Sequence, residues 1–308
     1  MNYYFNKNKI VAFTKEITIE FDNPYEGIEK DFCIDENGYQ LLNAIKPKNI
    51  SVGDSLILDK KTKIRLLNDR PSLFEDNFTN ELFLDLDKLK QATQFAEVKN
   101  TNRPILQGIY VNGKGTIMAT DSFKLYIYDC GDDDNSVVIS KELAKELTKY
   151  DGYQLFRFNS NVAQVFIEEQ NITITGRLYQ GTYPKIRGII PISGKTIKLS
   201  KEELSNHLNI GKYITGETKV CNISNKEISI YSFDSESDIY KSDIQTNDEE
   251  FSFLLNYDYL KLAISCFTNI SFLVDSNDPK NKPIAIRNID TDSEESKVVV
   301  ILIPMREI

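Results

Sequence analysis

Histidine is almost absent from this sequence, since His207 is the only one among 308 residues. Histidine carries much of the acid–base, nucleophilic and zinc chemistry of proteins. A solitary histidine therefore argues against a hydrolase or a metalloenzyme, and we expect no enzymatic activity, no cofactor and no metal site. His207 follows the polar Asn206, so we expect it on the polar surface of a helix.

Cysteine and long apolar runs are also scarce. The four cysteines (Cys33, Cys130, Cys221 and Cys266) lie far apart without a C-x-x-C spacing. This pattern is typical of reduced thiols in a cytosolic protein, not of a disulfide or zinc framework. No apolar run approaches the length of about 18 residues that a membrane helix needs. The first ten residues, MNYYFNKNKI, lack the apolar core of a signal peptide. We therefore expect a cytoplasmic protein.

The overall composition is that of a folded chain, with 41% hydrophobic and 27% charged residues. The length allows two or three domains with substantial cores. The formal net charge of −9 by itself argues against nucleic-acid binding. The sum does not say where the charges lie, however, and a local basic surface can still bind phosphates.

Alternating apolar and polar residues dominate the sequence and predict β-strands separated by Asn, Asp and Gly turns. Examples are EITIEFD, KLYIYD, AQVFIEE, NITITGRL, EISIYSF and KVVVILI. Helical patterns are fewer, and the clearest cover residues 86–99, 141–150, 201–208 and 257–267. The expected fold class is α+β, with antiparallel sheets that carry a few helices on one side.

An internal repeat relates distant parts of the chain. At an offset of 107 residues, Tyr3 aligns with Tyr110, Ile10 with Ile117 and Ala12 with Ala119. Further along, Asp35, Ser140 and Asn256 each stand between an apolar strand and a helical pattern. Their side chains are of the types that cap a helix N-terminus. Each copy is therefore predicted to contain a strand that ends in a cap and is followed by a helix.

The repeat predicts three domains, at residues 1–78, 79–191 and 192–308. The last opens with Ser200-x-x-Glu203, a capping-box pattern. Residues 1–78 match only the later part of the unit, so the first domain lacks an opening strand and helix of about 30 residues.

Three short motifs suggest chemistry that their context does not support. GIIPISGKT resembles a phosphate-binding loop, but Gly188 is one residue too far from Gly194 and a strand pattern follows. GDDDN (131–135) clusters carboxylates, but its spacing fits no calcium loop, so we expect a solvated loop. Thr120-Asp121-Ser122 lies between two predicted strands and is expected to form a turn, not a metal site.

Lysines recur on the predicted non-core faces of several helices. Lys141, Lys145 and Lys149 are spaced by four residues and lie on one helix face, opposite Leu143 and Leu147. The remaining members of this set are Lys88, Lys99, Arg103, Lys201 and Lys261. A shared basic surface would bind phosphates without reading base sequence. The competing interpretation is a solvated face on which Glu142 and Glu146 pair with Lys145 and Lys149.

Several segments resemble the β sliding clamp of bacterial DNA polymerase III. ATQFAEVKNTNRPILQGIYV and MATDSFKLY are similar to its middle domain, and RLYQGTYPKIRGIIP to the segment that closes that domain. FLLNYDYL and the terminal VVVILIPMREI are similar to its last domain. The resemblance covers residues 79–308. Residues 1–78 match the family more weakly, through their similarity to the repeated unit of this chain. The short first domain makes a version from a phage or a mobile element plausible, which would place the protein in a host cytoplasm.

The resemblance implies a non-enzymatic head-to-tail homodimeric ring, with sheets outside and helices lining a hole for duplex DNA. It also implies a hydrophobic pocket that binds peptides of DNA polymerase, the clamp loader and other partners. The implied pocket residues are Leu106, Thr120, Ser122, Phe123, Lys124, Leu125, Pro184, Ile189, Asn256, Tyr259, Ile301, Ile303, Pro304, Met305 and Arg306.

The sequence departs from the family pattern at the pocket as well as in the first domain. Ser122-Phe123 replaces the family's Gly-His, and Gly188 replaces an arginine. Two other functions remain open. One is a protein-interaction module that does not encircle DNA. The other is a metal-dependent nuclease, against which the sequence argues because it contains no convergent carboxylate motif.

Overall fold

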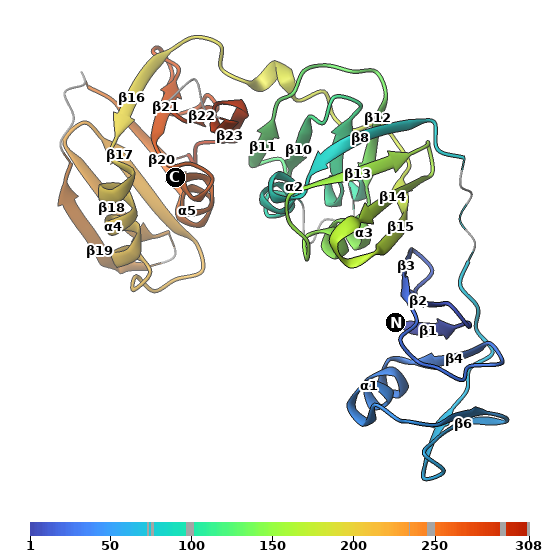
Figure 1. The fold of residues 1–308 in the computed structure, drawn as a ribbon. Helices are drawn as coiled ribbons and strands as arrows, with labels where there is room; N and C mark the ends of the chain where they lie inside the picture. The colour runs from blue at the N-terminus through green and yellow to red at the C-terminus, as the bar shows by residue number, and fades with distance from the viewer. Residues whose placement is uncertain are drawn as a thin grey trace. The chain divides into compact units, whose positions relative to one another are not determined.

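The computed structural model describes residues 1–72, 74, 77–96, 102–233, 235–244, 250–289 and 294–306. It has an α+β fold in which antiparallel strands outnumber helices, as the sequence predicts (Figure 1). The chain forms two compact units, and their boundary passes through helix α2 (Leu86–Thr93) and strand β9 (Ile109–Asn112).

Unit 1 comprises residues 1–90, 111–115 and 133–181. Its first strands are β1 (Asn2–Phe5), β2 (Lys9–Phe13), β3 (Ile17–Asp22) and β4 (Phe32–Asp35), followed by helix α1 (Glu36–Ile45). A small sheet follows, made of β5 (Ile50–Val52), β6 (Ser55–Leu58) and β7 (Thr62–Arg65). The remaining elements are β8 (Asn80–Asp85), β12 (Ser136–Ile139), α3 (Lys141–Leu147), β13 (Tyr153–Phe158), β14 (Val162–Ile167) and β15 (Ile172–Tyr179).

The main sheet of unit 1 has the order β4-β1-β2-β3-β15-β12, and β15 also continues through β14 and β13 to β8. Strand β3 joins β15 in antiparallel register, with Ile19 opposite Ile174. Both of these side chains are buried, so this junction is part of the core.

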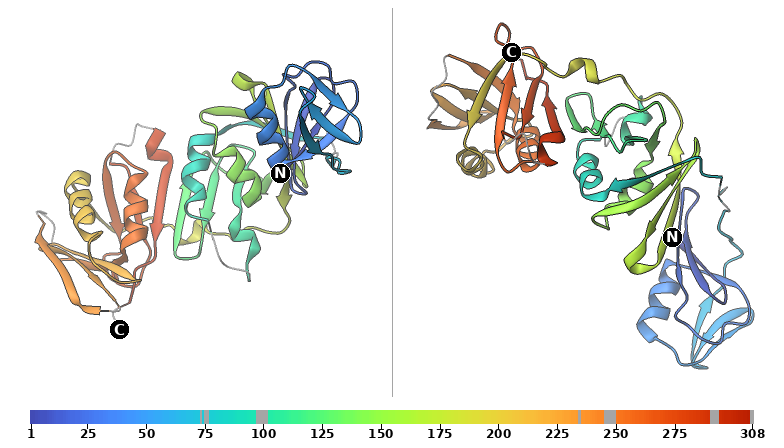
Figure 2. Two further views of the ribbon diagram at one scale, coloured as in Figure 1. Left: turned by 90° about the horizontal axis from the view of Figure 1, so that it is seen from below. Right: turned by 45° about the horizontal axis from the view of Figure 1, so that its top comes forward.

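Unit 2 comprises residues 91–110, 116–132 and 182–308. Its strands are β10 (Ile117–Thr120), β11 (Lys124–Tyr128), β16 (Lys195–Leu199), β17 (Lys219–Ser224), β18 (Glu227–Ser232), β19 (Ser235–Asp243), β20 (Ser252–Asn256), β21 (Ile270–Val274), β22 (Ile284–Arg287) and β23 (Val298–Leu302). One sheet has the order β16-β21-β22-β23-β11-β10, and the other has the order β19-β18-β17-β20. Helices α4 (Lys201–Gly211) and α5 (Tyr257–Ser265) contact each other beside the second sheet (Figure 2, left).

The sequence repeat is reproduced in the strand register. Ile10 lies opposite Phe21 in the β2–β3 pair, and Ile117 lies opposite Tyr128 in the β10–β11 pair. Both partners are displaced by the same 107 residues, so the two hairpins are equivalent pair by pair. The alternation of apolar residues sets this register, because a slip of one residue would turn the buried face outward.

All four predicted helix caps are confirmed. Asp35 accepts from Gly38 N, Ser140 from Leu143 N, and Ser200 from Glu203 N. Asn256 accepts from both Asp258 N and Tyr259 N. A fifth cap was not predicted: Asp85 Oδ1 accepts from Lys88 N at 3.0 Å at the start of α2. Helix lengths were predicted less well, because α2 ends at Thr93 and α4 continues to Gly211.

In the described part of the chain before β8, the elements begin with β1, and α1 is the helix that follows β4. In unit 2, α5 packs against α4, and Tyr257 Oη donates to the Leu208 carbonyl at 2.5 Å. Helix α1 contacts aromatic side chains of the neighbouring segments. Tyr3 stacks on Tyr39 with ring centroids 3.8 Å apart, and Tyr25 Oη donates to Asn43 Oδ1 at 2.5 Å.

The prediction of a surface histidine was wrong. His207 is only 9% exposed, and its Nδ1 lies 2.7 Å from the Tyr240 hydroxyl on β19. Its Nε2 is 4.0 Å from Glu203 Oε1, which is too far for a hydrogen bond. Pattern analysis placed His207 on the polar face of α4, but β19 packs against the helix and covers it.

Candidate functional site

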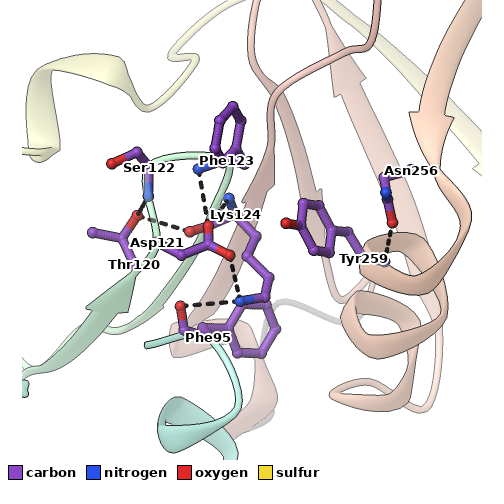
Figure 3. Close-up of polar contacts among 8 residues, drawn as sticks. All are labelled: Phe95, Thr120, Asp121, Ser122, Phe123, Lys124, Asn256 and Tyr259. Atoms are coloured by element: carbon purple, nitrogen blue, oxygen red, sulfur yellow. Dashed lines mark hydrogen bonds and ion pairs between the residues drawn. The ribbon is translucent and has the colours of Figure 1, made fainter. Parts of the chain in front are cut away.

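The turn between β10 and β11 is held by a network centred on Asp121. Asp121 Oδ1 accepts from Phe123 N and Lys124 N, both at 2.9 Å, and Ser122 N donates to Thr120 Oγ1 at 3.0 Å (Figure 3). Ser122 has a φ of +80°, a left-handed conformation typical of a tight turn. These bonds confirm the turn predicted for Thr120-Asp121-Ser122.

A buried ion pair lies beneath this turn. Lys124 Nζ is 2.7 Å from Asp121 Oδ2, and the two side chains are only 8% and 11% exposed. The same ammonium donates to the Phe95 carbonyl at 3.3 Å and lies 5.2 Å from the ring centroid of Tyr259. A buried charge is tolerated only when it is paired and hydrogen-bonded. Lys124 therefore connects the turn to the segment after α2 and to the first turn of α5 (Figure 3).

Phe123 points away from this network and is 59% exposed (Figure 3). Its neighbours explain the direction, because Asp121 and Lys124 are drawn inward by their ion pair. The Phe123 carbonyl accepts from Ile303 N at 2.9 Å, so the C-terminal segment is bonded to the turn. An exposed aromatic side chain on a rigid backbone can anchor an apolar group of a partner.

The C-terminal segment runs between two sheets of unit 2. Strand β23 pairs with β11, placing Ile301 opposite Leu125. Past the end of β23, Met305 N donates to the Leu254 carbonyl of β20 at 2.8 Å. A hollow of about 250 Å³ beside this segment is lined by Ser252, Phe253, Leu254, Lys280, Asn281, Met305 and Arg306.

Tyr259 is oriented by the cap of α5. Asn256 Oδ1 accepts from Asp258 N at 3.0 Å and from Tyr259 N at 3.1 Å. These bonds fix the first turn of the helix, and the ring of Tyr259 faces Lys124 (Figure 3). The structure thus joins Lys124, Tyr259 and Ile303 around one turn, although they come from distant parts of the sequence.

The predicted pocket residues differ in accessibility. Leu106, Thr120, Leu125 and Ile301 are buried and belong to the core beneath the turn. Ile189 is exposed in the segment that precedes β16, as is Pro184, and no described contact joins either residue to the turn. The sequence indicates Asp121 as a turn residue, but not its ion pair with Lys124 or the contact of Lys124 with Phe95, because both depend on where folding buries the ammonium group.

Arg187 provides a second ionic contact in unit 2. It makes two hydrogen bonds of 2.9 Å to the Asp129 carboxylate and lies 2.9 Å from Asp132. The hydrogen bonds from Arg187 lower the pKa of Asp129 below its ordinary value. Asp132 belongs to the GDDDN segment (131–135), which is predicted to be a solvated loop. In the structure it pairs with Arg187. The GKT motif runs into a strand, as predicted, since Lys195 and Thr196 are the first two residues of β16.

The candidate DNA-binding residues fall into three groups. Lys141, Lys145, Lys149, Arg103 and Lys261 are exposed, and Leu143 and Leu147 are buried on the opposite face of α3. Lys88 and Lys201 are half-buried, and Lys201 Nζ is bonded to the Phe267 carbonyl. Lys99 lies outside the described residues.

The competing interpretation of the lysine face is partly confirmed. Lys149 Nζ lies 2.6 Å from Glu146 Oε2, in the predicted ion pair. Glu142 instead accepts a hydrogen bond from Tyr179 Oη at 3.4 Å. Lys141 and Lys145 are therefore the better candidates for phosphate contacts on α3.

The described residues contain no group of three or more His, Cys, Asp or Glu side chains placed to hold a metal ion. Nor does any helix in the described parts of the chain combine the length and the apolar character that a membrane span requires.

No protein-family model and no curated protein sequence matches this chain. Solved structures do match it. They include a DnaN sliding clamp (DNA polymerase III subunit beta) from Bartonella birtlesii, bound to griselimycin, at 20% identity and a TM-score of 0.78. The match covers 99% of this chain and 91% of that one.

Two further structures agree. The DNA polymerase sliding clamp of Bacillus subtilis matches at 18% identity and a TM-score of 0.79, covering 100% of this chain and 91% of that one. The Helicobacter pylori beta clamp bound to a DNA ligase peptide matches at 16% identity and a TM-score of 0.77, covering 99% and 91%. The chain therefore has the fold of the bacterial DNA polymerase III beta sliding clamps.

Proposed function

We propose that this protein is a DNA sliding clamp that encircles duplex DNA and tethers a DNA polymerase, a clamp loader and other partners. The observation that carries the proposal is the clamp fold over nearly the whole chain, built from repeats with equivalent strand register and capped helices. Such a protein acts by topological linkage and has no catalytic step. In this proposal, the domains are residues 1–78, 79–191 and 192–308, and the protein works in a bacterial cytoplasm or in that of a phage host.

Self-association is supported by the way strands join within the chain. Strand β3, the third strand of the repeat that begins with β1, pairs with β15, the last strand of the next repeat. In the same way, β11 pairs with β23, the last strand of the repeat that follows it. Strand β19 is the third strand of the last repeat, and β7 is the last strand of the first repeat. Among the described residues, each lies at an edge of its sheet. Pairing β19 of one copy with β7 of another, twice over, would close a head-to-tail ring.

Exposed apolar side chains support the same junction. Ile210 and Tyr213 at the end of α4 are exposed, Tyr213 by 75%, and Ile239 is exposed on β19. Leu41 and Ile45 are exposed on α1, the helix that belongs to the same repeat as β7. Exposed apolar patches of this kind mark protein–protein interfaces.

Duplex DNA is the proposed ligand of the lysine-bearing helices. The exposed lysines of α3 and α5 would contact phosphates without reading base sequence. Weak contacts that depend on salt suit a sliding protein, because retention then rests on ring closure and not on affinity.

The turn around Phe123 is the proposed partner-binding site. Phe123 and Tyr259 offer aromatic surface, and Met305 and Arg306 line the adjacent hollow. Rigid aromatic anchors and a few polar groups are what a peptide site requires. The other predicted pocket residues would support this surface from below or from the segment that precedes β16.

Loading onto nicked circular DNA tests the ring. We expect the protein to remain bound to the circle and to dissociate once the circle is cut. Equal retention on circular and linear DNA would contradict topological linkage. A protein that binds the DNA ligase peptide recognised by the Helicobacter pylori clamp, but is never retained on circles, would instead be the interaction module that does not encircle DNA.

A further inference from the structure

The segment from residue 46 to residue 65 is strongly basic within an acidic protein. It contains six Lys or Arg residues and two Asp residues, a net charge of +4, whereas the whole chain carries −9. All six cations are exposed: Lys46, Lys48, Lys60, Lys61, Lys63 and Arg65. They lie on the small sheet β5–β7 and its flanks, not on the helices considered above.

Four of these lysines are gathered at one end of the small sheet. Asp59 Oδ1 accepts from Lys48 N at 3.1 Å and from Asn49 N at 2.9 Å, and Asp59 N donates to the Asn49 carbonyl at 2.9 Å. These bonds hold the start of β5 against the turn between β6 and β7. Lys48 therefore lies close to the turn that contains Lys60 and Lys61, and Lys46 stands two residues before Lys48; we call these four residues the N-terminal lysine cluster.

Two members of the cluster occupy backbone positions that disfavour lysine. Lys60 has a φ of 60° and follows Asp59 at 50°, in a two-residue hairpin turn closed by Lys61 N and the Leu58 carbonyl at 3.0 Å. Lys46 has a φ of 47° at the end of α1. Glycine or asparagine is the usual residue at such positions, because a Cβ is crowded there. Residues held in sparsely populated backbone conformations cluster at functional sites.

The cluster is free to bind an external anion. None of the ion pairs among the described residues involves its four ammonium groups, and the carboxylate of Asp59 is engaged by backbone N–H groups. Helix α1 (Glu36–Ile45), which immediately precedes the cluster, contains no Lys or Arg. Exposed lysines also precede the helix, at Lys7, Lys15 and Lys30, but the densest group of cations lies beyond its end.

We propose that the N-terminal lysine cluster binds the phosphate backbone of nucleic acid, which would give residues 1–78 a DNA contact that helix α1, without Lys or Arg, does not provide. This inference rests on the proposed clamp function. Phosphate is favoured over an acidic protein because residues 46–65 contain no aromatic residue and have six Lys or Arg against two Asp; the exposed Leu41 and Ile45 belong to α1 and are assigned above to the junction with a second copy. Protein interfaces are centred on aromatic and apolar groups, whereas phosphate contacts need only cations.

Two pairs of substitutions in the full-length protein test the cluster. Lys46→Gly with Lys60→Gly removes two cations and relieves the left-handed strain, so the melting temperature should stay equal or rise. Lys48→Ala with Lys61→Ala removes the other two. Lys7→Ala with Lys226→Ala is the matched control, since both of these lysines are exposed and lie outside the cluster.

Binding is measured by fluorescence anisotropy with a short labelled linear duplex over a range of salt concentrations. Each cluster pair should weaken binding about 3- to 10-fold at low salt and reduce the salt slope by about 1.8, since each phosphate contact contributes about 0.9. The control should match the wild type. Polyglutamate serves as the second probe.

The inference is overturned if both cluster pairs bind the duplex as the control does, or if the wild type shows no salt-dependent binding. It is also overturned if the cluster pairs lose polyglutamate but keep the duplex, because the partner would then be an acidic protein. Retention of the wild type on nicked circles is scored separately. If the wild type is retained on nicked circles but the cluster substitutions do not change duplex binding, the proposed clamp function stands and only the role of the cluster is refuted.

Discussion

Replacing Lys124 by methionine tests whether the buried ion pair organises the candidate peptide site. Methionine keeps the length of the side chain and its apolar stem but removes the ammonium group. Asp121 would then retain its two backbone N–H donors while Oδ2 lost its partner at 2.7 Å. At that distance the attraction between unit charges is about 6 kcal/mol for an effective dielectric constant near 20. Removing one member of a buried pair costs about 3–5 kcal/mol, because the other charge remains unpaired.

The assay combines hydrogen exchange with peptide binding. We expect the amides of Phe123 and Lys124 to exchange about 100-fold faster or more in Lys124→Met, since about 1.4 kcal/mol corresponds to each factor of ten. Affinity for the DNA ligase peptide should fall as well, because Tyr259 loses the cation beneath its ring. Lys226→Met, at an exposed lysine, is the control and should change neither quantity.

A double-mutant cycle decides between an ion pair and simple packing. Asp121→Asn together with Lys124→Met should be less destabilised than the sum of the two single changes, with a coupling of about 0.5–3 kcal/mol. Additive effects, or a Lys124→Met protein with unchanged exchange at the turn, would refute the reasoning.

Three further predictions follow from other parts of the molecule. Changing Lys141, Lys145 and Lys149 together to Glu should abolish retention on nicked circular DNA yet leave ligase-peptide affinity within about twofold, because these lysines are exposed and lie outside the candidate peptide site; loss of both activities would show that the lysines are structural. Ile210→Asp with Tyr213→Asp should convert a dimer into a monomer in sedimentation experiments, since an apolar interface does not tolerate two buried carboxylates, whereas an unchanged mass would exclude this surface. The stabilisation from Arg187 and Asp129 should be fully present above the ordinary Asp pKa of about 3.9 and be lost as the pH falls through the lowered pKa of the folded state; Arg187→Gln should flatten this acid limb of a melting-temperature profile, and an identical profile would contradict the role of the pair.

Local patterns in the sequence predicted the elements that depend on neighbouring residues. Asp35, Ser140, Ser200 and Asn256 cap helices because a cap bonds an amide two or three positions away. The turn after Thr120 is predictable for the same reason, since the Asp121 side chain accepts hydrogen bonds from the amides two and three positions further on, Phe123 N and Lys124 N. Strand alternation and the repeat then predicted the α+β fold.

Features that depend on distant segments escaped the sequence. His207 is buried because β19, more than twenty residues away, packs across α4. Lys201 is tied to the Phe267 carbonyl, which helical spacing could not reveal. Likewise, helical periodicity does not show that the Asp59 hydrogen bonds bring Lys48 close to the turn that contains Lys60.

The sequence by itself determined the repeat, the caps, the turn and the class of fold, because each rests on periodicity or on bonds between close neighbours. Only the tertiary structure decided which charges are buried, which are paired and which remain exposed. Lys124 is the clearest case: its spacing marks it as the first residue of a strand, but its environment is formed by Phe95 and Tyr259. A charge responds to everything within a few ångströms, and those neighbours are brought together by folding, not by sequence order.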